Sequence, residues 1–143
     1  MLNEIEHERK MAQHLFYVSL KYTKTTDVIL NLLARWESLL DKCIELLLKK
    51  AKKAKKISAI PETPKARELE IRRIYSKDEI VQKAMNLYSL FHRMPTLEKF
   101  REAEFRKNVA VTVMNYESKT EINMDKLKEW EKLIESFIIY LKK

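Results

Sequence analysis

The sequence predicts an all-α protein, a single-domain antiparallel helical bundle of about five helices with one long central helix. Apolar residues recur at helical spacing along most of the 143 residues. One stretch, residues 27–57, is apolar on nearly every side. The chain contains no glycine, the residue on which β-hairpins rely for tight turns. We expect one domain over residues 1–143, long enough to bury a core without a disulfide or a metal.

The central helix is expected over residues 27–57. Its main apolar side chains alternate at steps of four and three residues, the period of one helix face: Ile29, Leu33, Trp36, Leu40, Cys43 and Leu47. Further apolar residues widen this stripe until only a narrow polar band remains, so the helix must contact several neighbours at once. Its last two turns carry lysines on all sides, which predicts that this end projects past the core into solvent.

The segment before the central helix predicts an amphipathic helix from Asn3 to about Lys21. Residues 23–26 include three threonines, which weaken a helix interior, and Thr25 or Thr26 can cap the helix that follows. Because no glycine marks this break, a bent but continuous helix is the alternative interpretation.

Residues 58–64 are the clearest predicted loop. Thr63 is a favourable N-cap for the next helix, and Pro64 then occupies its first position, where proline is tolerated. Residues 64–93 form either one kinked helix or two, since residues 76–79 have the form of a capping box while the apolar face continues across them. Asn123 is the expected cap of the last helix.

Residues 96–116 are predicted to form a helix capped by Thr96. Its apolar face would consist of Leu97, Phe100, Phe105, Val109, Val113 and Tyr116. Residues 109–113 favour β structure because they are rich in valine and threonine. A lone strand would have no partner elsewhere in the chain, so we predict helix here.

The composition excludes several function classes. Without glycine, the chain lacks the phosphate-binding loops of kinases and P-loop enzymes, the dinucleotide fingerprint and the nucleophile elbow. The single cysteine, Cys43, has no partner for an internal disulfide and is expected to be buried. No run of apolar residues approaches the length of a membrane span, and the acidic amino terminus is unlike a signal peptide, so we expect a cytoplasmic protein.

Lysine and glutamate dominate the charged residues. Seventeen glutamates stand against four aspartates. This bias resembles the composition of hyperthermophile proteins, but it equally suits helices, because lysine and glutamate propagate them well. A thermophilic source and a simple helical preference are therefore both open interpretations.

The positive charge is concentrated in residues 49–73. Ten cations there face three glutamates, which accounts for seven of the formal net charge of +8. Such a tract can attract phosphates of nucleic acid or another polyanion. A simpler interpretation is that lysines favour the carboxy-terminal end of any helix and a solvated tip. The candidate anion-binding residues are Lys49, Lys50, Lys52, Lys53, Lys55, Lys56, Lys65, Arg67, Arg72 and Arg73.

A second candidate pattern is Arg9 and His14, separated by four residues. This spacing resembles the Arg-x4–6-His motif of HEPN domains, small dimeric helical bundles of which many members cleave RNA. The resemblance implies a metal-independent ribonuclease in which the motif pairs across a dimer and His14 or Arg9 assists attack by a ribose hydroxyl. In that family the motif lies near the last long helices, whereas here it lies on the first. An ordinary, partly buried helix residue is the alternative interpretation of His14.

Carboxylates at helical spacing form a third pattern. Glu37, Asp41 and Glu45 lie along one line of the central helix, and Glu98 and Glu102 repeat this step. Bundle proteins that bind two metals use inward-facing glutamates together with two Glu-x-x-His pairs. This chain has one such pair, at its amino terminus, and neighbouring lysines and arginines offer simple ion pairs instead. We therefore expect no metal and no cofactor.

These observations favour a non-enzymatic interaction or assembly module. Its apolar stripes exceed what one core needs, so we expect a homodimer. The basic end over residues 49–73 would contact nucleic acid or an acidic protein. The HEPN-like ribonuclease using Arg9 and His14 is the enzymatic alternative. A membrane-surface binder is less favoured, because the lysine tract lacks a bulky apolar face.

Overall fold

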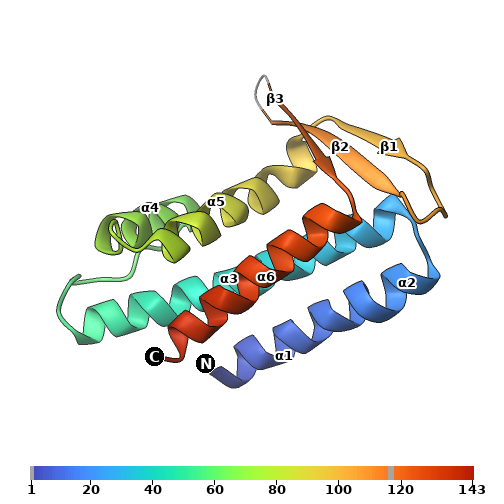
Figure 1. Cartoon of the computed structure of the whole chain (residues 1–143). Coiled ribbons are helices and arrows are strands. Elements are labelled where there is room, and N and C mark those ends of the chain that lie inside the picture. Colours follow the sequence, from blue (N-terminus) through green and yellow to red (C-terminus); the bar gives the residue numbers. More distant parts are fainter. Residues whose placement is uncertain (1, 116–117) are drawn as a thin grey trace.

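The computed structural model describes residues 2–115 and 118–143 and shows a mostly helical protein with a small antiparallel sheet (Figure 1). The first helix is continuous and contains a π-helical turn, η1 (Leu15–Ser19), between α1 (Leu2–His14) and α2 (Leu20–Tyr22). The remaining helices are α3 (Thr26–Lys53), α4 (Pro64–Ile74), α5 (Glu79–Arg93), the short 3-10 helix η2 (Met94–Thr96) and α6 (Met124–Leu141).

α3 is the central helix of the molecule. It contacts α1, α4, α5 and α6, and also the middle strand of the sheet. Trp36 is 3% exposed, and its ring lies 6.2 Å from the ring of Phe16 and 6.1 Å from that of Phe91. α3 runs antiparallel to α1 and α5 and parallel to α6, as Figure 1 shows. The predictions of a long central helix and of about five helices are thus confirmed for the described residues.

Side-chain caps begin three of these helices at the predicted positions. The Thr25 hydroxyl accepts a hydrogen bond from the Val28 amide, and Asn123 does the same for Lys126 at the start of α6. Thr63 caps α4, with Pro64 next to it. Each cap satisfies a backbone N–H that has no partner within its helix.

Residues 64–93 form two helices rather than one. α4 ends at Ile74, and the Gln82 side chain donates hydrogen bonds to the carbonyls of Arg72 and Tyr75. These bonds satisfy carbonyl groups at the end of α4 that have lost their helical partners. The break between the helices therefore costs few backbone hydrogen bonds.

The prediction of a helix over residues 96–116, and with it the purely all-α class, is wrong. A three-stranded antiparallel sheet in the order β1-β2-β3 occupies this part of the chain (Figure 1). Its strands are β1 (Lys99–Glu102), β2 (Ala110–Asn115) and β3 (Ser118–Ile122). Thr96 does not cap a helix, since its hydroxyl donates to the Arg93 carbonyl. Tyr116 lies outside the described residues.

Burial of alternate residues explains why this segment forms a strand rather than a helix. Val109, Val111 and Val113 are all fully buried, which a strand achieves by pointing alternate residues to one face. The partners of β2 are polar segments that give little signal in the sequence: Lys99 pairs with Val113, and Ile122 pairs with Val111. Phe100 and Phe105, expected in the core, are instead 46% and 75% exposed.

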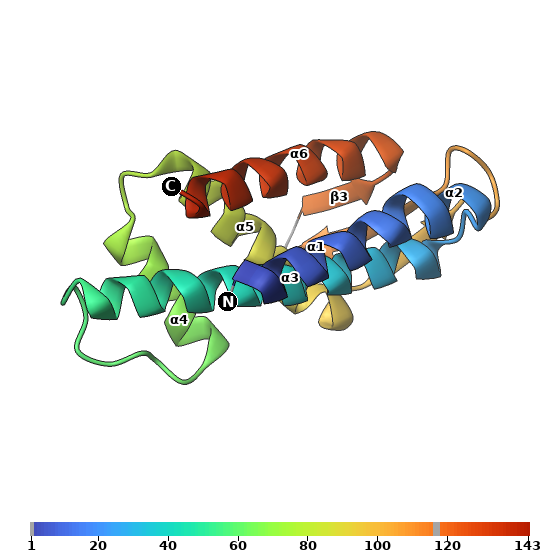
Figure 2. The same cartoon turned by 90° about the horizontal axis from the view of Figure 1, so that it is seen from below.

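The lysine-rich end of α3 extends beyond the ends of α1 and α6, as expected (Figure 2). The helix ends at Lys53 rather than at residue 57. Among the described helices, none combines the length and the apolar character that crossing a membrane requires.

Candidate polyanion-binding site

α3 ends in a turn that fixes the positions of its lysines. The Lys56 amide donates to the Ala51 carbonyl at 2.9 Å, and the Lys55 amide donates to the Lys52 carbonyl at 3.0 Å. This pair of bonds is the Schellman motif, which requires a left-handed residue at its turn. Lys55 takes that role with φ of 61°, although glycine is the residue usually found there. The motif therefore holds Lys52, Lys55 and Lys56 around one helix end.

Within the described part of the chain, Lys52, Lys53 and Lys55 have no hydrogen-bond or ion-pair partner for their ammonium groups, and all three are exposed. We call these three residues the lysine end. A surface hollow of about 430 Å³ lies against Lys52 and Lys55 and continues over Ile57 and Ser58. These cations are available to a ligand without breaking an existing contact.

The other seven predicted anion-binding residues are already engaged. Arg72 pairs with the buried Glu68 at 2.9 Å, and Arg73 pairs with Glu70. Arg67 donates to the Pro61 carbonyl at 2.7 Å. The lysines make four further contacts: Lys49 with Glu45, Lys65 with Glu68, Lys50 with the Leu141 carbonyl, and Lys56 over the ring of Tyr75. The structure thus divides the predicted set, leaving three lysines free of such contacts.

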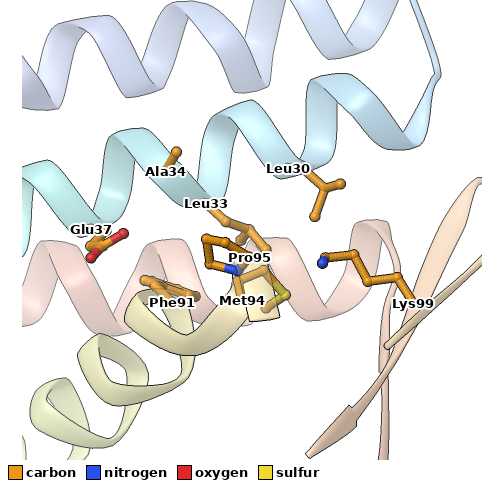
Figure 3. Close-up of a pocket in the computed structure, with 8 residues that line it drawn as sticks. All are labelled: Leu30, Leu33, Ala34, Glu37, Phe91, Met94, Pro95 and Lys99. Carbon is orange, nitrogen blue, oxygen red and sulfur yellow. The ribbon is translucent and has the colours of Figure 1, made fainter. Parts of the chain in front are cut away.

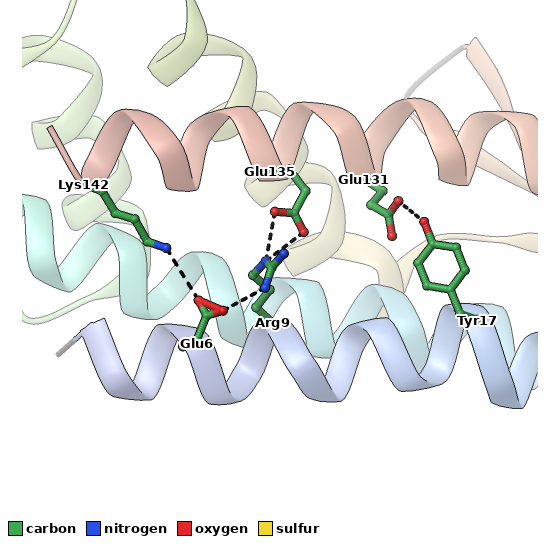
Figure 4. Close-up of polar contacts among 6 residues, drawn as sticks. All are labelled: Glu6, Arg9, Tyr17, Glu131, Glu135 and Lys142. Carbon is green, nitrogen blue, oxygen red and sulfur yellow. Dashed lines mark hydrogen bonds and ion pairs between the residues drawn. The ribbon is translucent and has the colours of Figure 1, made fainter.

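Arg9 and His14 are not brought together in one site. The Arg9 guanidinium donates to both carboxylate oxygens of Glu135 on α6 and to Glu6 (Figure 4). These contacts raise the pKa of Arg9 and join α1 to α6. His14 is exposed, and at about 100° per residue it lies roughly 140° around the helix from Arg9. The arrangement gives the ribonuclease alternative no shared cleft.

The carboxylates of α3 are engaged as single contacts. Glu37 bonds His92 at 2.7 Å, Asp41 accepts from Tyr88 at 2.6 Å, and Glu45 pairs with Lys49 at 3.2 Å. Over residues 2–115 and 118–143, no group of three or more histidine, cysteine or acidic side chains could hold a metal ion. Cys43 is buried, and that burial raises the pKa of its thiol to about 12, so it is not a thiolate nucleophile at neutral pH.

An apolar groove of about 200 Å³ lies between α3 and the end of α5 (Figure 3). Glu37 and Lys99 lie at its two ends, and both are engaged within the chain, Glu37 by His92 and Lys99 by the Leu97 carbonyl. The groove therefore presents an apolar lining: Leu30, Leu33, Ala34, Phe91, Met94 and Pro95.

The opposite end of α3 carries a second group of cations that the sequence analysis did not identify. The β1–β2 loop contacts the turn between α2 and α3, where the Phe105 amide donates to the Lys24 carbonyl at 2.5 Å. One signal was present in the sequence: residues 9–26 contain no aspartate or glutamate. We call these cations, together with two aromatic residues beside them, the hairpin-end patch: Lys21, Tyr22, Lys24, Phe105, Arg106 and Lys107.

Comparison with known proteins found no matching family model, no matching curated protein and no matching solved structure.

Proposed function

We propose that this protein is a non-enzymatic binding module that contacts an extended polyanion, with nucleic acid as the favoured ligand, through the lysine end of α3. The observation that supports this most strongly is that Lys52, Lys53 and Lys55 are exposed and unpaired within the described chain, while the cations around them are engaged. The helix dipole alone would be complemented by one or two cations, so it does not require three further unpaired lysines at this end.

The contact is electrostatic in character. Among the residues that the structure describes, no exposed aromatic ring lies at the lysine end to stack a base, since the nearby Tyr75 is half-buried beneath Lys56. Lysine ammonium groups act on phosphates as point charges rather than as bidentate donors. Binding should therefore depend on backbone charge and salt, with little dependence on base sequence.

Fluorescence anisotropy with labelled duplex DNA and duplex RNA tests the proposal. We compare the variant Lys52→Gln, Lys53→Gln, Lys55→Gln with a control that loses equal charge, Lys83→Gln, Lys128→Gln, Lys132→Gln. The first variant should bind more weakly, and the slope of log K against log salt should fall by about 2 to 3. Equal weakening in the two variants, or no weakening in the first, would contradict the proposal.

The homodimer expected from the sequence remains a prediction, as do the single domain and the cytoplasmic location. Multi-angle light scattering at two protein concentrations measures the oligomeric state directly. A monomer at both concentrations would contradict the dimer and leave the polyanion proposal unchanged.

A further inference from the structure

Two aromatic side chains are held in water at the amino-terminal end of α3. Tyr22, at the end of α2, is 77% exposed, and Phe105, in the β1–β2 loop, is 75% exposed. Burying a phenylalanine ring gains about 1.5–3 kcal/mol, so a ring left this exposed forgoes a gain that most phenylalanines in folded proteins obtain. The core does not include either ring.

The β1–β2 loop is anchored rather than loose. Glu104 accepts hydrogen bonds from both the amide and the hydroxyl of Thr26, and Arg101 donates to the same hydroxyl. Ala103 and Phe105 adopt left-handed backbone with φ of 53° and 64°. Such a conformation costs roughly 1–2 kcal/mol for each non-glycine residue. The anchoring contacts thus hold a strained loop in an arrangement that leaves Phe105 exposed.

Positive charge surrounds both rings. Lys21 lies over the Tyr22 ring at 5.8 Å, and Arg106 and Lys107 directly follow Phe105. Two neighbouring carboxylates are engaged within the chain: Glu104 accepts from the Thr26 hydroxyl, and Asp27 pairs with Arg101 at 2.7 Å. An anionic ligand with flat, apolar faces fits this combination of cations and exposed rings.

We propose that the hairpin-end patch binds unpaired nucleotides of single-stranded nucleic acid, with Tyr22 and Phe105 stacking on bases and Lys21, Arg106 and Lys107 contacting phosphates. The Lys24 ammonium already donates to the Lys21 carbonyl. Single-strand-binding surfaces combine these two features, and stacking tolerates any base sequence. A duplex offers the same phosphates but keeps its bases stacked on one another. A membrane surface would require a broader apolar face than two rings among lysines and arginines. This site is independent of the lysine end.

Anisotropy of a labelled oligo(dT) strand tests the patch, with Tyr22→Leu and Phe105→Leu as the variants. Leucine retains an apolar side chain but removes the ring, and it shares the backbone preferences of phenylalanine at Phe105. Each variant should weaken oligo(dT) binding roughly tenfold without changing the salt slope. Phe100→Leu is the matched control, because Phe100 is an exposed ring on the same hairpin but outside the patch, and it should leave binding unchanged.

Three results would overturn this proposal: unchanged oligo(dT) affinity in both patch variants, equal weakening of oligo(dT) and duplex binding, or equal weakening in the Phe100 control. Loss of binding to phosphatidylglycerol vesicles with intact oligo(dT) binding would assign the patch to membranes and reject it as well. Circular dichroism of each variant checks that the fold is intact. Tyr22→Leu and Phe105→Leu should also weaken oligo(dT) binding when they are made in the Lys52→Gln, Lys53→Gln, Lys55→Gln variant. This result would show that the patch acts independently of the lysine end.

Discussion

The two ends of α3 present cations in different settings. At the carboxy-terminal end, Lys52, Lys53 and Lys55 surround the end of the helix, and no exposed ring from residues 2–115 or 118–143 accompanies them. At the amino-terminal end, lysines and arginines surround Tyr22 and Phe105, which a strained loop holds in water. The ends are separated by a helix of 28 residues, about 42 Å long.

The difference shows that charge density alone does not indicate which cations are free to contact a ligand. Most of the net charge lies in residues 49–73, yet arginines there are tied to local glutamates and a carbonyl. The hairpin end has fewer cations, but it combines them with two exposed rings, and the neighbouring Glu104 and Asp27 are engaged within the chain. We therefore expect contacts of different chemistry at the two ends of α3: phosphate attraction at the lysine end, and base stacking in addition at the hairpin-end patch.

The largest expected effect comes from a substitution in the core, because it destabilises the part of the fold that supports both ends of α3. Trp36 is buried between the rings of Phe16 and Phe91, so Trp36→Ala should lower the free energy of unfolding by about 3–5 kcal/mol. Urea denaturation measures this loss, and Leu69→Ala, at a residue 53% exposed, is the control with little expected effect. A loss below about 1 kcal/mol would show that the ends do not depend on a common core.

A change at Thr26 should affect the hairpin end alone. Thr26→Val keeps the shape of the side chain but removes the hydroxyl that bonds Glu104 and Arg101, at an expected cost of roughly 1–3 kcal/mol. Hydrogen exchange should show faster exchange over residues 103–109, while the amides of α6 keep their protection. Equal exchange in the variant and the wild type would mean that the loop is held by other contacts.

The sequence predicted the helical part well and the hairpin end poorly, for a physical reason. Caps such as Thr25, Thr63 and Asn123 act within three residues, and helical periodicity is local, so both can be recognised in a short window. Pairing of β1 with β2 joins residues up to 14 positions apart, as for Lys99 and Val113, and the loop geometry depends on contacts with Thr26. The residue that holds this loop, Glu104, lies 78 positions along the chain from its partner.

The candidate site divides in the same way. The tract over residues 49–73 could be located from charge alone, but which of its cations are free depends on side-chain partners such as Glu68, which no periodicity indicates. Phe105 carried no signal as a surface residue, since its spacing also fits a helix face. Only the absence of carboxylates over residues 9–26 marked that end.

Lys55 offers a smaller and sharper test of the carboxy-terminal end. Lys55→Gly relieves the left-handed backbone, and Lys55→Ala retains that strain, while both remove the charge. The glycine variant should be more stable than the alanine variant by about 1 kcal/mol in thermal unfolding, with equally weakened duplex binding. At Lys49, inside α3, the order should reverse by about 1 kcal/mol. The same order at both positions would contradict the role of Lys55 in ending the helix.

The smallest effect is expected away from both ends, at Tyr17 in η1 and Tyr140 in α6. A hydrogen bond to Glu131 raises the pKa of Tyr17 to about 12, and burial together with Asp78 raises the pKa of Tyr140 to about 12 (Figure 4 shows Tyr17). Unfolded tyrosines ionise near pH 10, so the folded state holds these protons more tightly. This stabilisation is complete below pH 10 and is lost as the pH rises toward 12.

Tyr17→Phe and Tyr140→Phe test that expectation, because each should flatten the decline in the free energy of unfolding between pH 10 and about 12. Tyr17 is 54% exposed, so water screens its contact and its effect should stay below about 1 kcal/mol. Urea denaturation at several alkaline pH values measures the slope. Both variants should bind duplex and oligo(dT) as the wild type does at neutral pH, because neither residue belongs to the lysine end or the hairpin-end patch. Weakened binding in Tyr17→Phe would instead extend the patch along the first helix.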